Sequence, residues 1–246
     1  MSRLGALRPP HQGESRPSAP APPSARMRLI RAAERLFAER GIEVVSLREI
    51  SRAAGQGNTN ALQYHFGDRD GVLDAILQRH GRDLDVRRWA LLDEYHPTHG
   101  DPRAVAAILV RPIVSKLDDP DGGPEYLQIA AEVVNRSNDL VVPDKPSVLS
   151  DPTLSDEDDS VNAWAHLATP FIPARAAGHP FHRRYLAVRF AYLEAGRRAR
   201  NIRTPDHRLF TAHVIDLVTT LLSAPLSEET HRALETKGAT RRANRR

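Results

Sequence analysis

The chain has 246 residues, of which 40% are hydrophobic and 27% charged, and its formal net charge is +4. This composition is typical of a globular protein and excludes a wholly disordered chain. The absence of cysteine excludes disulfides, thiolate metal sites and cysteine nucleophiles. No run of about 18 apolar residues occurs and prolines interrupt the N-terminus, so we expect a cytoplasmic protein that neither spans a membrane nor is exported.

The first 66 residues predict an extension followed by three helices. Residues 1–25 are rich in Pro, Ser and Ala and are expected to be disordered. From Arg26 apolar residues recur at helical spacing up to Gly41, which suits a helix C-terminus. The second helix begins in "VSLREI", where Ser46 and Glu49 form a predicted capping box. A glycine turn ends this helix, and a third is expected over 59–66 with Asn58 as its N-cap.

The rest of the chain is also predicted to be helical. Asp68 opens a helix to about Leu92, Asp101-Pro102 opens one that Pro112 should kink, and Pro124 opens another. A long loop covers 139–158, and a shorter helix covers 160–168. Two amphipathic helices, 180–200 and 205–224, should form an antiparallel hairpin before a flexible basic tail. We expect an all-α fold of about nine helices, with domains at 26–72 and 73–228 and the tail at 229–246.

The three N-terminal helices predict a helix-turn-helix, whose last helix can enter a DNA major groove. The segments "RAAERLFAERG", "SLREISRAAG" and "YHFGDRDGVL" resemble the DNA-binding domain of TetR-family transcriptional regulators. The close match covers 28–77, and beyond it only the architecture is similar. The resemblance implies that Tyr64 and His65 meet DNA phosphates and that Phe66 anchors the helix in the core. It also implies that Arg69 replaces a phosphate-binding lysine.

Between Gly55 and Tyr64 the sequence has eight residues, "QGNTNALQ", where the family commonly has seven. Asn and Gln side chains can pair with adenine, and Thr can contact a thymine methyl, but Asn58 could instead be spent on capping. A second interpretation also stays open, in which Tyr64 and Phe66 are both core aromatics. The predicted DNA-binding residues are Ser46, Arg48, Gln56, Asn58, Thr59, Asn60, Gln63, Tyr64, His65 and Arg69.

The resemblance further implies a homodimer and an effector pocket in the C-terminal domain, with ligand binding tilting the helix that starts after Asp68. The expected function is a sequence-specific repressor that binds double-stranded operator DNA and is released by a small molecule. The predicted pocket residues are Trp89, Tyr126, Trp164, Phe171 and Tyr192. The predicted dimer residues are Leu186, Phe190, Leu193, Val214, Leu217, Val218 and Leu221.

Signals for other functions are weak. No complete catalytic or phosphate-binding motif occurs, so we expect no enzyme activity and no cofactor. Two pairs of histidines lack acidic partners nearby in sequence, His96 with His99 and His179 with His182. The acidic run 156–159 is interpreted as a solvated loop. No metal site is therefore predicted. The basic tail is expected to add sequence-independent attraction to DNA. The alternative function is a helical small-molecule-binding protein or enzyme whose first three helices are only structural.

Overall fold

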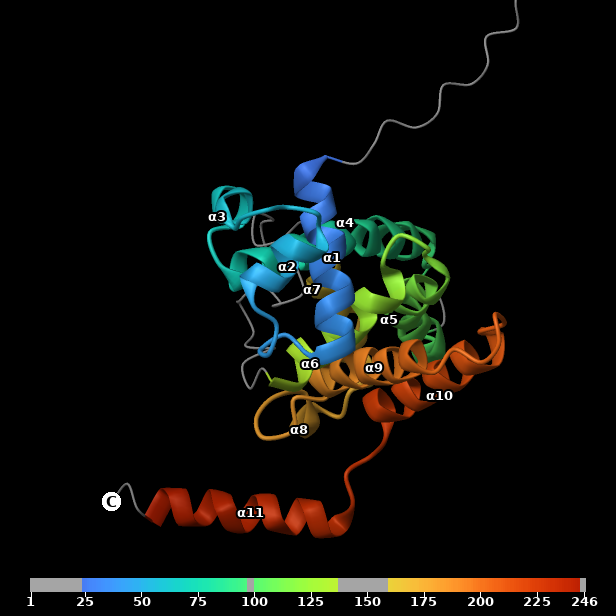
Figure 1. Cartoon of the computed structure of the whole chain (residues 1–246). Helices are drawn as coiled ribbons and strands as arrows, with labels where there is room; N and C mark the ends of the chain where they lie inside the picture. Colours follow the sequence, from blue (N-terminus) through green and yellow to red (C-terminus); the bar gives the residue numbers. More distant parts are fainter. Residues whose placement is uncertain (1–23, 97–99, 137–158, 244–246) are drawn as a thin grey trace, which may run out of the picture.

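The computed structural model describes residues 24–96, 100–136 and 159–243, with side chains as far as Thr236. Within these ranges the protein contains eleven α-helices, two short 3-10 helices and no strands (Figure 1). The predicted all-α class is therefore confirmed. The two helices beyond the predicted nine are α8, Ala174–Ala177, and α11, Glu228–Ala243. The predicted N-terminal extension, except for its last two residues, and the loop 139–158 lie outside the described residues.

The N-terminal domain consists of α1 (Ala25–Arg40), α2 (Leu47–Ala53) and α3 (Asn60–Phe66), and the first turns of α4 (Arg69–Glu94) complete its core. α1 turns an apolar side toward the others, because its buried residues Leu29, Ala33 and Phe37 recur at four-residue spacing. The short helices α2 and α3 each bury one large side chain, Ile50 and Leu62. α4 then continues into the rest of the protein (Figure 1). The most deeply buried side chains of this core are Leu29, Ile30, Phe37, Val45, Ile50, Leu62, Val72 and Ile76.

The C-terminal domain is built around α6 and α9, with α5 and α10 packed beside them. α6 and α9 approach closely at Gly196, where a Cβ would come within 2.5 Å of the Ala131 Cβ and 2.8 Å of the Leu127 carbonyl oxygen. Only glycine fits this crossing without a shift of the backbone. The elements of this domain are α5 (Pro102–Ser115), η2 (Lys116–Asp118), α6 (Gly123–Arg136), α7 (Ser160–Ala168), η3 (Thr169–Phe171), α8, α9 (Arg183–Arg200) and α10 (Arg208–Ser223).

The predicted helix starts are confirmed by their caps. The Asp68 carboxylate accepts a hydrogen bond from the Gly71 amide at 2.9 Å, and the Asp101 carboxylate accepts one from the Arg103 amide at 2.8 Å. Each carboxylate satisfies an amide that the helix itself leaves unpaired. Pro112 lies inside α5, which continues to Ser115, and the kink expected there stays a prediction.

α11 corrects the expectation of a flexible tail. Its start signal is local, because the Ser227 hydroxyl accepts from the Thr230 amide at 3.2 Å and Glu228 and Glu229 occupy its first turn, where acidic groups favour a helix. α11 leaves the body at the opposite end from α3 (Figure 1). The expectation that the basic tail adds to the attraction for DNA stays a prediction, because the side chains after Thr236 lie outside the described part of the chain.

Within the described ranges, no single helix is long and apolar enough to cross a membrane. α10 and residues 228–236 of α11 reach that length and composition only as a pair bent by 45°.

Candidate nucleic-acid interface

α2 is fixed by the predicted capping box. The Ser46 amide donates to Glu49 Oε2 at 2.9 Å, and the Glu49 amide donates to Ser46 Oγ at 3.3 Å. Arg40 at the end of α1 donates to Glu49 Oε1 at 2.6 Å. The Ser46 amide first, and then Arg40, lower the pKa of Glu49 to about 2. The Ser46 side chain, which the sequence placed among the DNA contacts, is thus occupied by the cap.

The turn between α2 and α3 covers residues 54–59. Gly55 has a φ of +72°, a conformation that glycine adopts at little cost, and the Gln56 amide donates to the Ser51 carbonyl at 2.8 Å. The Asn58 carboxamide oxygen accepts from the Asn60 amide at 3.1 Å. The N-cap residue of α3 is Thr59 and not Asn58 as predicted, although this bond still occupies the carboxamide oxygen of Asn58. Gln56 and Thr59 are half-buried in this turn.

α3 has one side in the core and one side in solvent. Leu62 is fully buried and Phe66, one turn later, packs against the core. Tyr64 is 86% exposed, and Asn60, Gln63 and His65 are also exposed. The interpretation in which Tyr64 and Phe66 are both core residues is therefore wrong. The outward residues at helical spacing are Asn60, Gln63 and Tyr64, and we call these three side chains the outer face of α3.

Arg69 is held within the protein. Its Nε donates to the Val45 carbonyl at 3.2 Å and its Nη1 donates to Glu43 at 3.1 Å. The side chain is 34% exposed. These contacts tie the start of α4 to the α1–α2 connection and use two of the three guanidinium nitrogens.

The first turns of α4 carry three carboxylates beside Arg69, namely Asp68, Asp70 and Asp74. The pKa of Asp74 is raised, first by partial burial and then by the negative charges of Asp70 and Asp68. The surroundings of Arg69 are therefore acidic, which opposes the approach of a phosphate.

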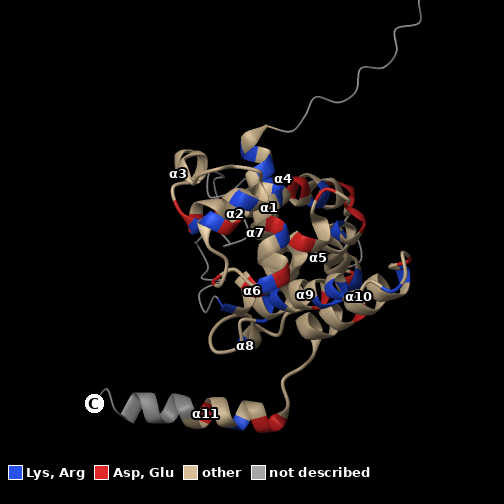
Figure 2. Cartoon of the chain, in the orientation of Figure 1, with Lys and Arg blue, Asp and Glu red and all other residues tan. Residues whose placement is uncertain are grey.

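Other cations surround α3, which contains no Lys or Arg itself. Arg48 and Arg52 are exposed one turn apart on α2. At the N-terminal end of α1, the guanidinium carbon of Arg26 lies 5.2 Å from the centroid of the Phe66 ring. Figure 2 shows basic segments at the start of α1 and on α2, beside an uncharged α3.

Sequence reasoning missed Arg26 and Arg52. Arg52 could have been found, because it follows Arg48 by four residues and so shares its side of α2. Arg26 could not, since only the tertiary fold brings it onto Phe66.

Residues 29–76, which hold α1 to α3 and the first turns of α4, match the family model described as "Bacterial regulatory proteins, tetR family". These residues form a TetR-family domain. The predicted resemblance is thus confirmed by sequence as well as by geometry. No curated protein matches the chain.

Solved structures resemble the chain beyond the TetR-family domain. Mycobacterium smegmatis AmtR is 20% identical, with 86% of this chain and 92% of AmtR aligned at a TM-score of 0.50. A bacterial regulatory protein in the tetR family from Rhodococcus RHA1 is 17% identical, over 83% of this chain and 100% of that one, at a TM-score of 0.49. The fatty acid degradation regulator FadR from Bacillus halodurans is 16% identical, over 81% of this chain and 98% of that one, at a TM-score of 0.47. The AmtR likeness shows that the fold is shared over most of the chain.

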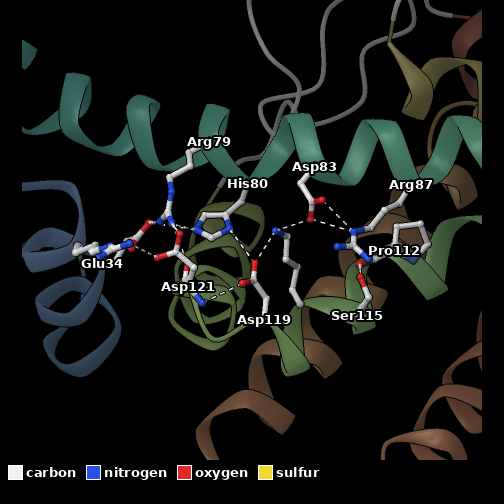
Figure 3. Close-up of polar contacts among 11 residues, drawn as sticks. Glu34, Arg79, His80, Asp83, Arg87, Pro112, Ser115, Asp119 and Asp121 are labelled. Atoms are coloured by element: carbon white, nitrogen blue, oxygen red, sulfur yellow. Dashed lines mark hydrogen bonds and ion pairs between the residues drawn. The ribbon is translucent and has the colours of Figure 1, made fainter. Parts of the chain in front are cut away.

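A polar cluster joins the TetR-family domain to the C-terminal domain (Figure 3). Glu34 of α1, only 1% exposed, accepts from Arg79 Nη1 at 2.6 Å and lies 3.1 Å from His80 Nε2. Arg79 also donates to the Asp121 carbonyl at 3.0 Å and pairs with the Asp121 carboxylate. α4 therefore links α1 to the loop before α6.

The same cluster continues along α4. Lys116, 2% exposed, lies 2.7 Å from the Asp83 carboxylate and 2.9 Å from that of Asp119. Partial burial alone would raise the pKa of both carboxyls, but hydrogen bonds to Lys116 lower each of them overall. We call this set the interdomain cluster: Glu34, Arg79, His80, Asp83, Lys116, Asp119 and Asp121.

A second polar group is enclosed among α4, α6, α7 and α9. Arg88, 1% exposed, donates to Ser160 Oγ at 2.6 Å and lies 3.4 Å from Asp85 Oδ1. The hydroxyls of Tyr126 and Tyr192 are 3.4 Å apart. Burial raises the pKa of both tyrosines, and the nearby charge of Arg88 opposes the rise. We call these five residues the Arg88 cluster.

The five predicted pocket residues differ in their surroundings. Tyr126 and Tyr192 belong to the Arg88 cluster, and buried Trp164 donates to the Val105 carbonyl at 2.9 Å. Trp89 and Phe171 are half-buried. A surface groove of about 840 Å³ between α5 and α10 is lined by none of the five; among its lining residues are Ala107, Arg111, His207 and Ile215.

The predicted dimer residues on α9 and α10 divide into two groups. Leu186 and Leu217 are 41% and 37% exposed, and Phe190, Leu193 and Leu221 are half-buried. Val214 and Val218 are at most 1% exposed, because they face the interior of their own chain. These two are therefore corrected from interface to core.

Among the described residues, no three His, Cys, Asp or Glu side chains come together in a way that could hold a metal ion. The rings of His179 and His182 lie 5.8 Å apart. His99, and all of the acidic run 156–159 except Asp159, lie outside the described residues. The Asp159 carboxylate caps α7 by accepting from the Val161 amide at 2.8 Å.

Proposed function

We propose that the protein is a homodimeric, sequence-specific DNA-binding regulator of transcription, which works in the cytoplasm without catalytic activity. The observation that carries the proposal is the outer face of α3. Three side chains able to hydrogen-bond, one of them a tyrosine that is 86% exposed, stand on a short helix whose other side is fixed in the core. An α-helix of this kind fits the DNA major groove, which is about 12 Å wide.

Contacts to bases are assigned to Asn60 and Gln63, whose carboxamides can pair with adenine edges. Tyr64, His65 and exposed Arg48 are assigned to phosphates, which fix the position of the helix. The longer turn of residues 54–59 is assigned a smaller part, because the carboxamide oxygen of Asn58 is bonded to the Asn60 amide.

Dimerisation is assigned to the side of α9 and α10 that carries Leu186, Phe190, Leu193, Leu217 and Leu221. These five side chains form an apolar stripe that is not fully covered in one chain. A twofold dimer through this stripe would present two copies of α3 to two DNA half-sites.

Relief of binding by a small-molecule effector is assigned to α4, because both polar clusters include it. The Arg88 cluster is the proposed point of action of an effector, and the interdomain cluster, which includes Glu34 of α1, is the proposed link to the TetR-family domain. A ligand that prefers a different tilt of α4 by a few kcal/mol would shift the population away from the DNA-binding form.

Selection of bound sites from random DNA tests the function. We expect the full-length protein to enrich a palindromic sequence with half-sites about one helical turn or more apart. A protein lacking residues 1–66 should enrich nothing, and it serves as the control. Enrichment of no sequence by the full-length protein would instead favour the small-molecule-binding alternative, in which the first three helices are only structural.

A further inference from the structure

We propose that Arg26, and not Arg69, is the residue that binds a DNA phosphate beside α3. The inference rests on the proposed function, since it concerns the same DNA interface. It reverses the assignment that the sequence implied, in which Arg69 replaces a phosphate-binding lysine.

Arg69 is occupied by the protein itself. Its Nε bonds the Val45 carbonyl and its Nη1 bonds Glu43. Glu43 is also held by Arg136 at 2.6 Å, so the three residues link the α1–α2 connection, α4 and α6. These bonds hold the guanidinium group in place and, within the described part of the chain, leave only its Nη2 nitrogen without a bond for a phosphate.

The charges around Arg69 also oppose a phosphate. Asp68, Asp70 and Glu43 all lie beside it, and the Asp68 carboxylate is fixed in the cap of α4. Asp74 follows one turn later. A phosphate at Arg69 would therefore approach a region with more negative than positive charge.

Arg26 is not occupied in this way. Its side chain is exposed and makes no hydrogen bond or ion pair with the described part of the chain. The Phe66 ring holds its guanidinium group by a cation–π contact, with 5.2 Å between the guanidinium carbon and the ring centroid. Phe66 is the last residue of α3 and directly follows exposed Tyr64 and His65. The contact thus fixes the guanidinium group of Arg26 at the end of the outer face of α3, with its N–H groups available to a phosphate.

The salt dependence of DNA binding distinguishes the two arginines. Each phosphate that a protein neutralises contributes about 0.9 to the slope of log K against log salt concentration. The full-length protein and its variants would be titrated against a selected DNA site by fluorescence anisotropy at several salt concentrations. Thermal unfolding of each variant would be measured in parallel.

We expect Arg26→Gln to reduce the slope by about 0.9 per half-site and the affinity by about tenfold per half-site. Its melting temperature should fall less than that of Arg69→Gln, because it loses only an exposed cation–π contact. Arg26→Lys keeps the charge and should retain most of the slope. Arg69→Gln should lower the melting temperature and leave the slope unchanged. Arg35→Gln is the matched control, because it removes the same charge from an exposed position on α1 and should change neither quantity.

An unchanged slope in Arg26→Gln would overturn the inference, and a reduced slope in Arg69→Gln together with it would restore the original assignment. The outcome for Arg26→Gln does not depend on whether Arg69→Gln folds. Failure of the unaltered protein to select DNA would instead overturn the proposed function, so the two failures are distinguishable.

Discussion

The TetR-family domain exposes the polar side chains assigned to its function, whereas the C-terminal domain encloses its own. On α3, Tyr64 is 86% exposed and its neighbours Gln63 and His65 point to solvent. In the C-terminal domain, Arg88 is 1% exposed and bonds Ser160 inside the fold. The first arrangement can meet a large partner without rearrangement, but the second can meet a ligand only if helices move.

This difference predicts opposite responses to mutation in the two regions. Removing a polar group from the outer face of α3 should impair DNA binding and leave stability unchanged. Removing one from the Arg88 cluster should reduce stability, because the remaining partners would be buried without compensation. The variants below follow this contrast from the largest expected effect to the smallest.

Arg88→Met is expected to have the largest effect. It leaves the Asp85 carboxylate enclosed without its cation, which should lower the free energy of unfolding by about 3–5 kcal/mol. Urea unfolding followed by circular dichroism measures the change. The adjacent Arg87→Met is the control, since the Arg87 side chain is 51% exposed and its pair with Asp83 should contribute at most about 1 kcal/mol. Equal losses of unfolding free energy in the two variants would contradict the expected difference between buried and exposed polar groups.

Glu34→Gln tests the interdomain cluster. The change removes the charge that Arg79 and His80 share, and we expect a loss of about 1–3 kcal/mol in unfolding free energy. Arg31→Gln removes only an exposed ion pair with Asp121 and should cost less than about 1 kcal/mol. If Glu34→Gln were as mild as Arg31→Gln, Glu34 would not hold the two domains together.

Ser46→Ala removes the N-cap of α2. The Glu49 amide would lose its acceptor, and unfolding free energy should fall by about 1 kcal/mol. Ser46→Thr, which can keep the cap, should restore most of the loss in the same urea titration. A neutral Ser46→Ala variant would show that the capping box does not stabilise the TetR-family domain.

The pH dependence of the same capping box follows from Glu49, whose pKa is lowered from an ordinary 4.5 to about 2 in the folded protein. A folded pKa below the unfolded one contributes stability above pH 4.5, which is lost as the pH falls toward 2. The stability difference between the unaltered protein and Glu49→Gln should therefore be constant at neutral pH and shrink over that acid range. A difference independent of pH would contradict the assigned cause.

The sequence predicted the elements whose signals are local. The capping box of Ser46 and Glu49, the cap at Asp68 and the span 160–168 of α7 all depend on neighbouring residues, and the structure confirms them. The inward direction of Phe66 followed from a family resemblance. α11 was missed because it has no apolar stripe, although Ser227 and two glutamates mark its start.

The contacts that decide the candidate site are tertiary and could not be read from the sequence. The Arg26–Phe66 contact joins residues 40 positions apart, and the bond from Arg69 to the Val45 carbonyl joins residues 24 positions apart. Val214 and Val218 fall on an amphipathic pattern that does not distinguish a core from a dimer interface. Only their burial shows which surface they face.

The central claim is that the outer face of α3 binds DNA, and Tyr64→Phe tests it most directly. The substitution removes one exposed hydroxyl and no buried contact. We predict that affinity for the selected DNA site, measured by fluorescence anisotropy, falls by about 0.5–1.5 kcal/mol per half-site, with an unchanged melting temperature. A variant that folds normally and binds the site with unchanged affinity would contradict the assignment of Tyr64 to the DNA interface.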